Sequence, residues 1–267
     1  MYQFEYSGPC HIASISDLHV RSAQDDRYQL LLGFLRSEVT KKSDIVVLLG
    51  DIFDLMVGLH MEYFEMYHDF FKELENLVLS FKKVVFVAGN HDFHLEKLFH
   101  YFNKKFHQKY DLEGKPLGVF YCSFGFTVKS KTGKKILFSH GHEFVPRKWK
   151  SLSYLGMING ALANLLANHF VSLNFLNKIG ALLAKKSDRH YTFFNEEQTK
   201  KNFRMWILPY VEEGHDLVIC GHSHIQDSWI DNEIPKYANN GFCPTTKASL
   251  KIILGENVEV EFIGLSS

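Results

Sequence analysis

Residues 45–51 read IVVLLGD, a short apolar run rich in β-branched residues that ends directly in a glycine and an aspartate. Two similar stretches flank it, because residues 11–19 read HIASISDLH and residues 84–92 read VVFVAGNHD. Short apolar runs bounded by Gly, Asp or Asn predict buried strands. Residues 25–41, which begin with an Asp cap, and residues 61–81 carry apolar side chains every three or four positions, which predicts amphipathic helices. Strands that alternate with helices indicate parallel pairing with right-handed crossovers.

The chain beyond residue 109 shows shorter strand-like runs that are separated by turns. A hairpin is expected over residues 119–129 and 135–139. Further strands are expected at residues 217–220, 228–230, 234–237, 249–254 and 258–263. This second half is predicted to be more antiparallel than the first. A layered α/β fold with two sheets accommodates both halves, and we expect residues 1–267 to form a single domain.

Composition excludes several classes of protein. The 267 residues include 30 basic and 30 acidic side chains, so the formal net charge is zero and a general nucleic-acid binder is not expected. The cysteines, at positions 10, 122, 220 and 243, are far apart, which excludes a C-x-x-C site and a dense disulfide framework. The N-terminal residues lack the basic and apolar regions of a signal peptide. These features predict a reduced, cytosolic protein.

One segment of the chain is unusually apolar. Residues 151–184 carry a single formal charge, Lys178, and basic residues lie on both sides of the segment. A membrane span is not expected, because several asparagines and His169 would lie in hydrocarbon. We predict two short helices that are broken near residues 172–174, within a helical insertion over residues 144–205. An ordinary buried helical hairpin and a pocket for apolar chains both fit this composition.

Five polar motifs come directly after predicted strands. They are Asp17-Leu18-His19, Gly50-Asp51, Gly89-Asn90-His91-Asp92, His140-Gly141-His142 and Gly221-His222-Ser223-His224. In layered α/β proteins, ligands bind beyond the carboxyl ends of the strands. We therefore expect the five motifs to converge on one rim of the fold.

The residue types in these motifs are those of a metal site. The candidate ligands are Asp17, His19, Asp51, Asn90, His140, His222 and His224. In a D-x-H or H-x-H motif, both side chains lie on the same side of an extended segment. Seven ligands are too many for one tetrahedral ion and suit two ions that share one carboxylate. Oxygen and imidazole donors without thiolate favour manganese, iron or zinc over calcium or magnesium.

The order of these motifs resembles that of the calcineurin-like metallophosphoesterase family. Over residues 12–224 the chain carries D-x-H, G-D-x-x-D from Gly50 to Asp54, G-N-H-D, a histidine after a strand, and G-H-x-H. The resemblance implies an αββα sandwich of two sheets. It also implies that one metal ion is held by Asp17, His19, Asp51 and His224, and the other by Asp51, Asn90, His140 and His222.

The same resemblance implies a hydrolytic mechanism. A hydroxide that bridges the two ions would attack phosphorus in line, while the ions neutralise the developing charge. His91 would stabilise the transition state or protonate the leaving oxygen, and Asp54 would orient a metal ligand or His91. The candidate residues for binding the substrate are Asn90, Arg147, Lys186 and Arg189.

A narrower resemblance concerns GNHDFHLEKLF at residues 89–99 and the insertion between His140 and Gly221. Both are similar to the UDP-2,3-diacylglucosamine hydrolases of lipid A biosynthesis. The resemblance implies cleavage of the substrate's pyrophosphate to UMP and 2,3-diacylglucosamine 1-phosphate (lipid X). For the two metal ions we expect manganese, with iron or zinc as the alternatives. The resemblance also implies a cytoplasmic protein that associates peripherally with the inner membrane and whose insertion is a lid over the acyl chains. His91 and His142 depart from the arginine and aspartate that many members carry at these positions.

Two alternatives fit the same sequence. One is a soluble metallophosphoesterase for a nucleotide or another small phosphate ester, with the apolar insertion used for packing or oligomerisation. The other is a non-catalytic scaffold whose helical hairpin binds a partner. Arg147, Lys186, Arg189 and Arg204 fit either phosphate binding or ordinary solvated charges at helix ends. The acyl-chain length and the oligomeric state are left open.

Overall fold

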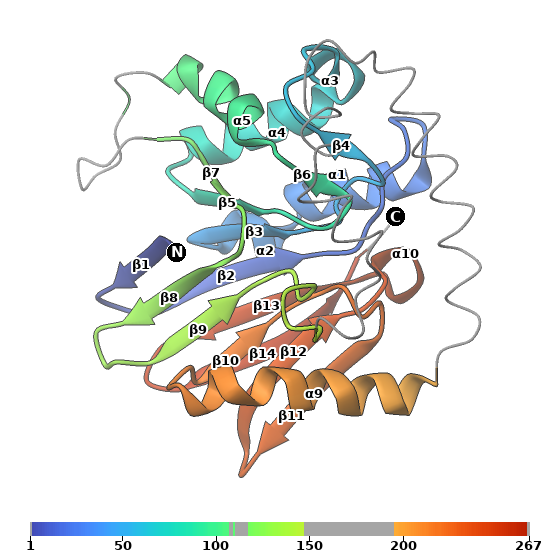
Figure 1. Ribbon diagram of the computed structural model, residues 1–267. Coiled ribbons are helices and arrows are strands. Elements are labelled where there is room, and N and C mark those ends of the chain that lie inside the picture. Colours follow the sequence, from blue (N-terminus) through green and yellow to red (C-terminus); the bar gives the residue numbers. More distant parts are fainter. Residues whose placement is uncertain (1, 107–108, 110–116, 147–194, 266–267) are drawn as a thin grey trace.

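Two six-stranded sheets lie face to face, and helices cover their outer surfaces (Figure 1). This computed structural model describes residues 2–106, 109, 117–146 and 195–265. The first sheet has the order β14 (Val258–Gly264), β13 (Ala248–Leu254), β2 (Cys10–Ile15), β3 (Ile45–Leu49), β5 (Lys83–Val87) and β7 (Val119–Cys122). The second has the order β1 (Tyr2–Tyr6), β8 (Phe126–Ser130), β9 (Lys135–Phe138), β10 (Leu217–Ile219), β12 (Ile234–Asn240) and β11 (Gln226–Asp231). A separate short pair consists of β4 (Met56–Val57) and β6 (Asp92–Phe93).

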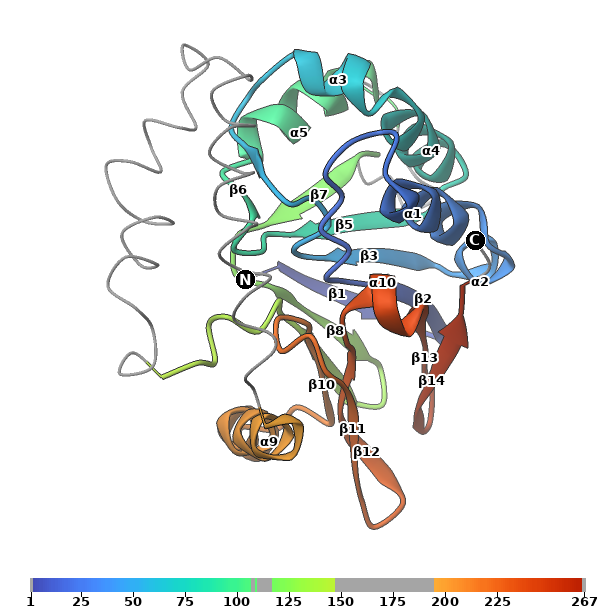
Figure 2. The ribbon, with the colours of Figure 1, turned by 90° about the vertical axis from the view of Figure 1, so that its right-hand side faces the viewer.

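Helices form the two outer layers (Figure 2). The first sheet is covered by α1 (Asp26–Arg36), α3 (Glu62–Met66), α4 (His68–Leu79) and α5 (Glu96–Asn103), while α2 (Glu38–Lys42) follows α1. The outer face of the second sheet is covered by α9 (Glu196–Glu212). The structure also describes two short helices, the 3₁₀ helix η1 (Lys104–Phe106) and α10 (Cys243–Thr246). The predicted αββα sandwich is therefore confirmed.

Successive side chains of a strand point to opposite faces of the sheet, and both faces are covered. This explains why the central strands are apolar throughout. Within β3, Ile45, Val47 and Leu49 belong to the hydrophobic cluster between the two sheets. Val46 and Leu48 belong to the cluster between the first sheet and its helices. The same alternation occurs in β10, where successive side chains pack against the first sheet or against α9. A strand that is covered on both faces has no solvent side, so polar residues appear only where it ends.

Each of the two predicted helices is divided in the structure. The helix predicted over residues 25–41 starts at the expected cap, because the Asp25 side chain accepts a hydrogen bond from the first turn of α1. It then breaks at Ser37, which is extended and caps α2 with its own hydroxyl oxygen. The helix predicted over residues 61–81 breaks at Tyr67 (φ −117°, ψ 40°) between α3 and α4. Apolar periodicity continues across both breaks, so the pattern did not reveal them.

The strand predicted over residues 119–129 is also wrong as a single element. It consists of β7 and β8, which belong to different sheets. Gly125, at φ +115°, lies between them, and a Cβ atom there would overlap with the carbonyl oxygen of Phe138. The β8–β9 hairpin is antiparallel as expected, but β9, β10 and β12 are parallel neighbours. The strand β1, which was not predicted, pairs with β8.

The predicted helical insertion falls mainly outside the described residues. Residues 147–194, including the expected break near residues 172–174, belong to that part of the chain. At its two ends, Phe144 and Phe203 pack in one cluster on the outer face of the second sheet. Within the described ranges, no helix has both the length and the apolar character needed to cross a membrane.

Candidate metal centre

The five polar motifs follow the carboxyl ends of five strands. The first three motifs come after β2, β3 and β5, which are parallel neighbours in the first sheet. The last two come after β9 and β10, which are parallel neighbours in the second sheet. Parallel strands present their carboxyl ends at the same edge. The structure thus brings together candidate ligands from both sheets.

One group of side chains consists of Asp17, His19, Asp51 and His224, whose ligand atoms all lie within 4.8 Å of one another. The Nε2 atoms of His19 and His224 are 3.1 Å apart, and His224 Nε2 is 3.3 Å from Asp17 Oδ1. Burial lowers the pKa of His19 to about 4, although the Asp54 carboxylate, which accepts a hydrogen bond from the ring, opposes this shift, so the ring is neutral near pH 7. A neutral imidazole has the free lone pair that a metal ion requires.

A second group is formed by Asp51, His140 and His222, with Asn90 beside them. His140 Nε2 lies 3.3 Å from Asp51 Oδ2 and 3.2 Å from Asn90 Oδ1. The other ring nitrogen, Nδ1, donates to the carbonyl oxygen of Leu49 at 2.9 Å. This bond orients the ring and leaves Nε2 as the ligand atom. Burial disfavours a charged His140, yet the Asp51 carboxylate raises its pKa to about 10, which shows how strongly the site attracts positive charge.

Asp51 connects the two groups through a single oxygen. Its Oδ2 atom lies 3.6 Å from His19 Nε2 and 3.3 Å from His140 Nε2. Its Oδ1 atom accepts a 2.9 Å hydrogen bond from the backbone N–H of His91. One carboxylate oxygen is therefore held by the backbone, while the other faces both ligand groups. This is the geometry that a bridging ligand needs.

Most of the candidate ligands have an uncommon backbone conformation. Positive φ values between 50° and 67° occur at Asp17, His19, Asp51, His222 and His224. Such a conformation costs about 1 kcal/mol or more for each non-glycine residue and persists only where the surrounding structure enforces it. Contacts with the rest of the fold thus stabilise backbone conformations that these segments would not adopt alone.

Two glycines allow the motifs to approach one another. A Cβ atom at Gly89 would overlap with the backbone N and the Oδ1 atom of Asp51. A Cβ atom at Gly221 would overlap with Asp17 Oδ2 and with the hydroxyl oxygen of Ser16. The glycine of G-N-H-D and that of G-H-x-H therefore leave the space in which the carboxylates lie.

Asp92 supports the centre, although the sequence analysis assigned it no role. Its carboxylate accepts hydrogen bonds from the backbone N–H groups of Asp51, Ile52, Phe53 and Gly89, at 2.6 to 3.2 Å. Burial and the nearby Asp51 carboxylate raise the pKa of Asp92 to about 7, and two of these amides oppose the shift. Asp92 thereby joins the loop after β3 to the loop after β5. The sequence feature that could have identified Asp92 is its position as the last residue of the G-N-H-D motif.

Two asparagines that the sequence analysis also missed support the other side. The Ser16 hydroxyl lies within hydrogen-bond distance of Asp17 Oδ2 and, at 2.9 Å, of Asn240 Oδ1, and shares its one proton between these two acceptors. Asn239 donates to the carbonyl oxygen of Gly221 at 2.7 Å. Both asparagines are fully buried at the end of β12. They form a sixth polar motif at the carboxyl end of a strand, which is the signal that could have identified them.

The family model described as calcineurin-like phosphoesterase matches residues 10–226 of the chain. The chain belongs to the calcineurin-like phosphoesterase family. This match includes all five strand-end motifs and the seven candidate ligands.

Individual relatives of this phosphoesterase are distant or match over short regions. UDP-2,3-diacylglucosamine hydrolase of Neisseria meningitidis serogroup B is 39% identical over 79 residues, which is 30% of this chain and 32% of that enzyme. An uncharacterized protein of Acanthamoeba polyphaga mimivirus is 24% identical over 94% of this chain, but the match spans 19% of the viral protein. Among solved structures, the GAP50 anchor of the Plasmodium inner membrane complex superimposes with a TM-score of 0.50 and 12% identity, covering 97% of this chain and 85% of that one. The chain spans less than a third of the length of the Neisseria and mimivirus proteins that it matches.

The residues present in this phosphoesterase fit two divalent metal ions. Each group combines imidazole nitrogens with a carboxylate, and the second group also has an amide oxygen. The described cysteines are buried in apolar surroundings, so thiolate is not part of the donor set. Imidazole nitrogens grouped around one shared carboxylate match the nitrogen and oxygen preferences of manganese, iron and zinc.

Asp54 and His91 lie beside the first group. Asp54 Oδ1 is 3.5 Å from His19 Nδ1, so its carboxylate orients a metal ligand. His91 Nδ1 donates to the Asp54 carbonyl oxygen at 2.7 Å, so Asp54 also orients His91. His142 lies near the second group, with its ring centroid 6.0 Å from that of His222.

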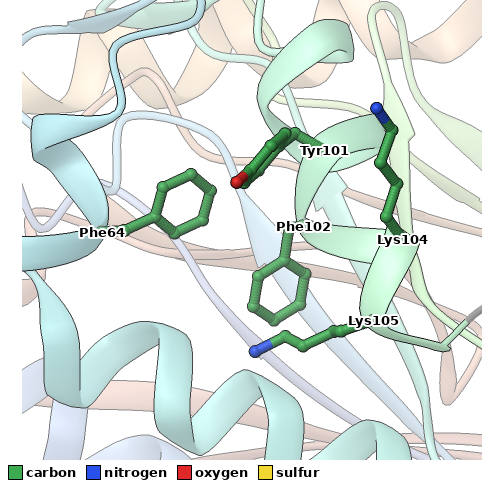
Figure 3. Close-up of a pocket in the computed structure, with 5 residues that line it drawn as sticks. All are labelled: Phe64, Tyr101, Phe102, Lys104 and Lys105. Carbon is green, nitrogen blue, oxygen red and sulfur yellow. The ribbon is translucent and has the colours of Figure 1, made fainter.

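The predicted substrate-binding residues are only partly described. Arg147, Lys186 and Arg189 lie outside the described residues, whereas Asn90 lies in the centre. Arg204 pairs with Asp227 and is thus occupied in the fold. A shallow pocket of about 290 Å³ on the helical layer is lined by Phe64, Tyr101, Phe102, Lys104 and Lys105, and includes no candidate site residue (Figure 3).

Proposed function

We propose that this phosphoesterase hydrolyses the pyrophosphate bond of UDP-2,3-diacylglucosamine and releases UMP and 2,3-diacylglucosamine 1-phosphate. The observation that carries the hydrolytic activity is the Asp51 Oδ2 atom, which faces the imidazoles of both ligand groups. The lipid substrate is supported by the local similarity to the Neisseria hydrolase, which includes only part of either chain. It is also supported by the apolar residues 151–184 with their basic flanks, a composition suited to acyl chains and phosphates.

Two bound divalent ions would supply an activated water and positive charge for the phosphoryl oxygens. The chain's own residues provide the positioning. Asp51 and Asp92 hold the loops after β3 and β5 at a fixed separation. Because the Nδ1 proton of His91 is donated to a carbonyl oxygen, Nε2 is the ring nitrogen that remains for a substrate oxygen. In its imidazolium form, which carries a proton on each ring nitrogen, His91 would donate from Nε2 to the phosphoryl or leaving oxygen.

Replacing His91 by glutamine should separate catalysis from metal binding. We expect kcat to fall by about a hundredfold, which is typical for the loss of a general acid or proton donor. The metal content should not change, because the His91 backbone N–H, which holds Asp51, is retained. Steady-state kinetics and elemental analysis would measure the two effects, with the exposed His100→Gln variant as a matched control. A parallel loss of metal would contradict a catalytic role for His91.

The substrate is tested by incubating the protein with UDP-2,3-diacylglucosamine, Mn²⁺ and detergent, and measuring the release of UMP. We expect rapid release that stops when a chelator removes the metal. Absence of UMP together with cleavage of bis-p-nitrophenyl phosphate would reject the lipid substrate and favour a phosphoesterase for small esters. Absence of both activities and of bound metal would favour a scaffold.

We further propose that the protein works at the inner-membrane surface, where a diacylated substrate resides. The support for this location is the composition of residues 151–184, since basic flanks attract anionic headgroups. Co-sedimentation with vesicles that contain anionic lipid would test it. Protein that stays in the supernatant at low and physiological salt would contradict the proposal.

A further inference from the structure

An aromatic side chain outside the five motifs covers the first ligand group. The ring of Phe242 is stacked on the ring of His224, with centroids 5.1 Å apart and an angle of 6° between the planes. The His19 ring also lies within 6.0 Å of the Phe242 ring. The backbone N–H of Phe242 donates to the carbonyl oxygen of His224 at 3.0 Å, so the two residues are joined through backbone and side chain. Phe242 therefore packs on the ring face of His224 and lies beside the tilted ring of His19.

Arg27 also contacts the Phe242 ring. Its guanidinium carbon lies 5.4 Å from the centroid of the Phe242 ring, within the range of a cation–π contact. Its Nη1 atom donates to the carbonyl oxygen of His19 at 3.0 Å. Arg27 therefore connects the backbone of one metal ligand with the ring that packs on another. The Phe242 ring thus contacts both the Arg27 guanidinium and the His224 imidazole.

The ligand rings of the second group are held in a different way. His140 is oriented by the backbone carbonyl of Leu49, as described above. Among the residues that the structure describes, the aromatic ring outside the histidines that lies beside His222 is that of Phe203, which is tilted by 51° at 6.3 Å and does not stack. Phe242 thus acts on one ligand group only.

We propose that Phe242, supported by Arg27, is a positioning residue for the first metal ion. It restricts the rotation of the His224 imidazole, so that Nε2 remains directed toward Asp17 and His19. A ligand that is held in its binding orientation loses less conformational freedom when the metal binds, so the affinity is higher. The inference rests on the dinuclear centre of the proposed function but not on the identity of the substrate.

The test is a calorimetric titration of the metal-depleted protein with Mn²⁺. For Phe242→Leu we expect one site with the wild-type affinity and one site that is about tenfold weaker, the lower end of the range for losing a group that orients a ligand. Phe242→Tyr keeps the ring and should restore both sites. The matched control is Phe124→Leu, because Phe124 is 71% exposed in the loop after β7.

Thermal unfolding separates positioning from a general loss of stability. The metal-free Phe242→Leu protein should unfold within a few degrees of the metal-free wild type, while its stabilisation by Mn²⁺ should be smaller. Wild-type affinity at both sites of Phe242→Leu, or equal weakening in Phe242→Tyr, would overturn the inference. Equal weakening of the two sites would also overturn it. A wild-type protein that binds fewer than two ions would overturn the dinuclear centre itself, and the inference with it.

Discussion

Replacing Asp51 by asparagine is expected to remove both metal ions and to lower turnover by about a thousandfold or more, which equals about 4 kcal/mol of transition-state stabilisation. The reason is that the two carboxylate oxygens of Asp51 make different contacts. Oδ1 accepts the hydrogen bond from the His91 backbone, and Oδ2 faces His19 and His140. In the asparagine variant the amide oxygen would take the place of Oδ1, and the NH₂ group would then face both metal positions without a lone pair to donate.

The opposite orientation of the amide is no better. It would place the NH₂ group against the His91 backbone N–H, where two donors repel each other. Elemental analysis and hydrolysis of bis-p-nitrophenyl phosphate would measure the two losses. The control is Asp69→Asn, because the Asp69 carboxylate is 56% exposed on α4 and far from the motifs in sequence. Two retained ions with an unchanged rate would refute the assignment of Asp51 as the shared ligand.

Replacing Asp92 by asparagine is expected to lower the free energy of unfolding by about 3 kcal/mol, because buried backbone donors would lose their acceptor. Each oxygen of Asp92 accepts two backbone N–H groups from the loops after β3 and β5. An asparagine keeps one of these oxygens and presents an NH₂ group to the remaining two donors. We also expect weaker metal binding, since the loop that contains Asp51 would be held by fewer hydrogen bonds.

Urea denaturation in the presence of a chelator would measure this effect without any contribution from metal binding. Asp69→Asn again serves as the control and should unfold at the wild-type urea concentration. An Asp92→Asn protein that unfolds together with the wild type would show that the four hydrogen bonds contribute little to stability. Metal titration of the same variant would then show whether Asp92 affects the centre alone.

Features that depend on neighbouring residues could be predicted from the sequence, whereas features that depend on residues far apart in the chain could not. The β3 run and the five motifs were recognisable because each depends on residues that are neighbours in the chain. The breaks at Ser37 and Tyr67 were not recognisable, because the apolar periodicity continues on both sides of each break. The separation of β7 from β8 was missed for a related reason. A run of strand-forming residues does not show that its two ends pair in different sheets.

The supporting residues of the centre show the same distinction. Asp92 belongs to a recognisable motif, but its role depends on how closely the loop after β3 approaches the loop after β5. Phe242 and Asn240 belong to no motif that the sequence analysis identified. Their contacts with His224 and Ser16 exist only because β12 ends beside the loops after β2 and β10.

The amino-acid sequence by itself determined which donor atoms this protein offers and that they follow the ends of buried strands. Spacings such as D-x-H and H-x-H act over a few residues, where backbone geometry alone decides what is near. Only the tertiary structure decided that Asp51 uses one oxygen for both groups and that Phe242 stacks on one of them. His140 and the Leu49 carbonyl that orients it are 91 positions apart in the chain. Contacts over such separations depend on how two sheets pack, which no local pattern specifies.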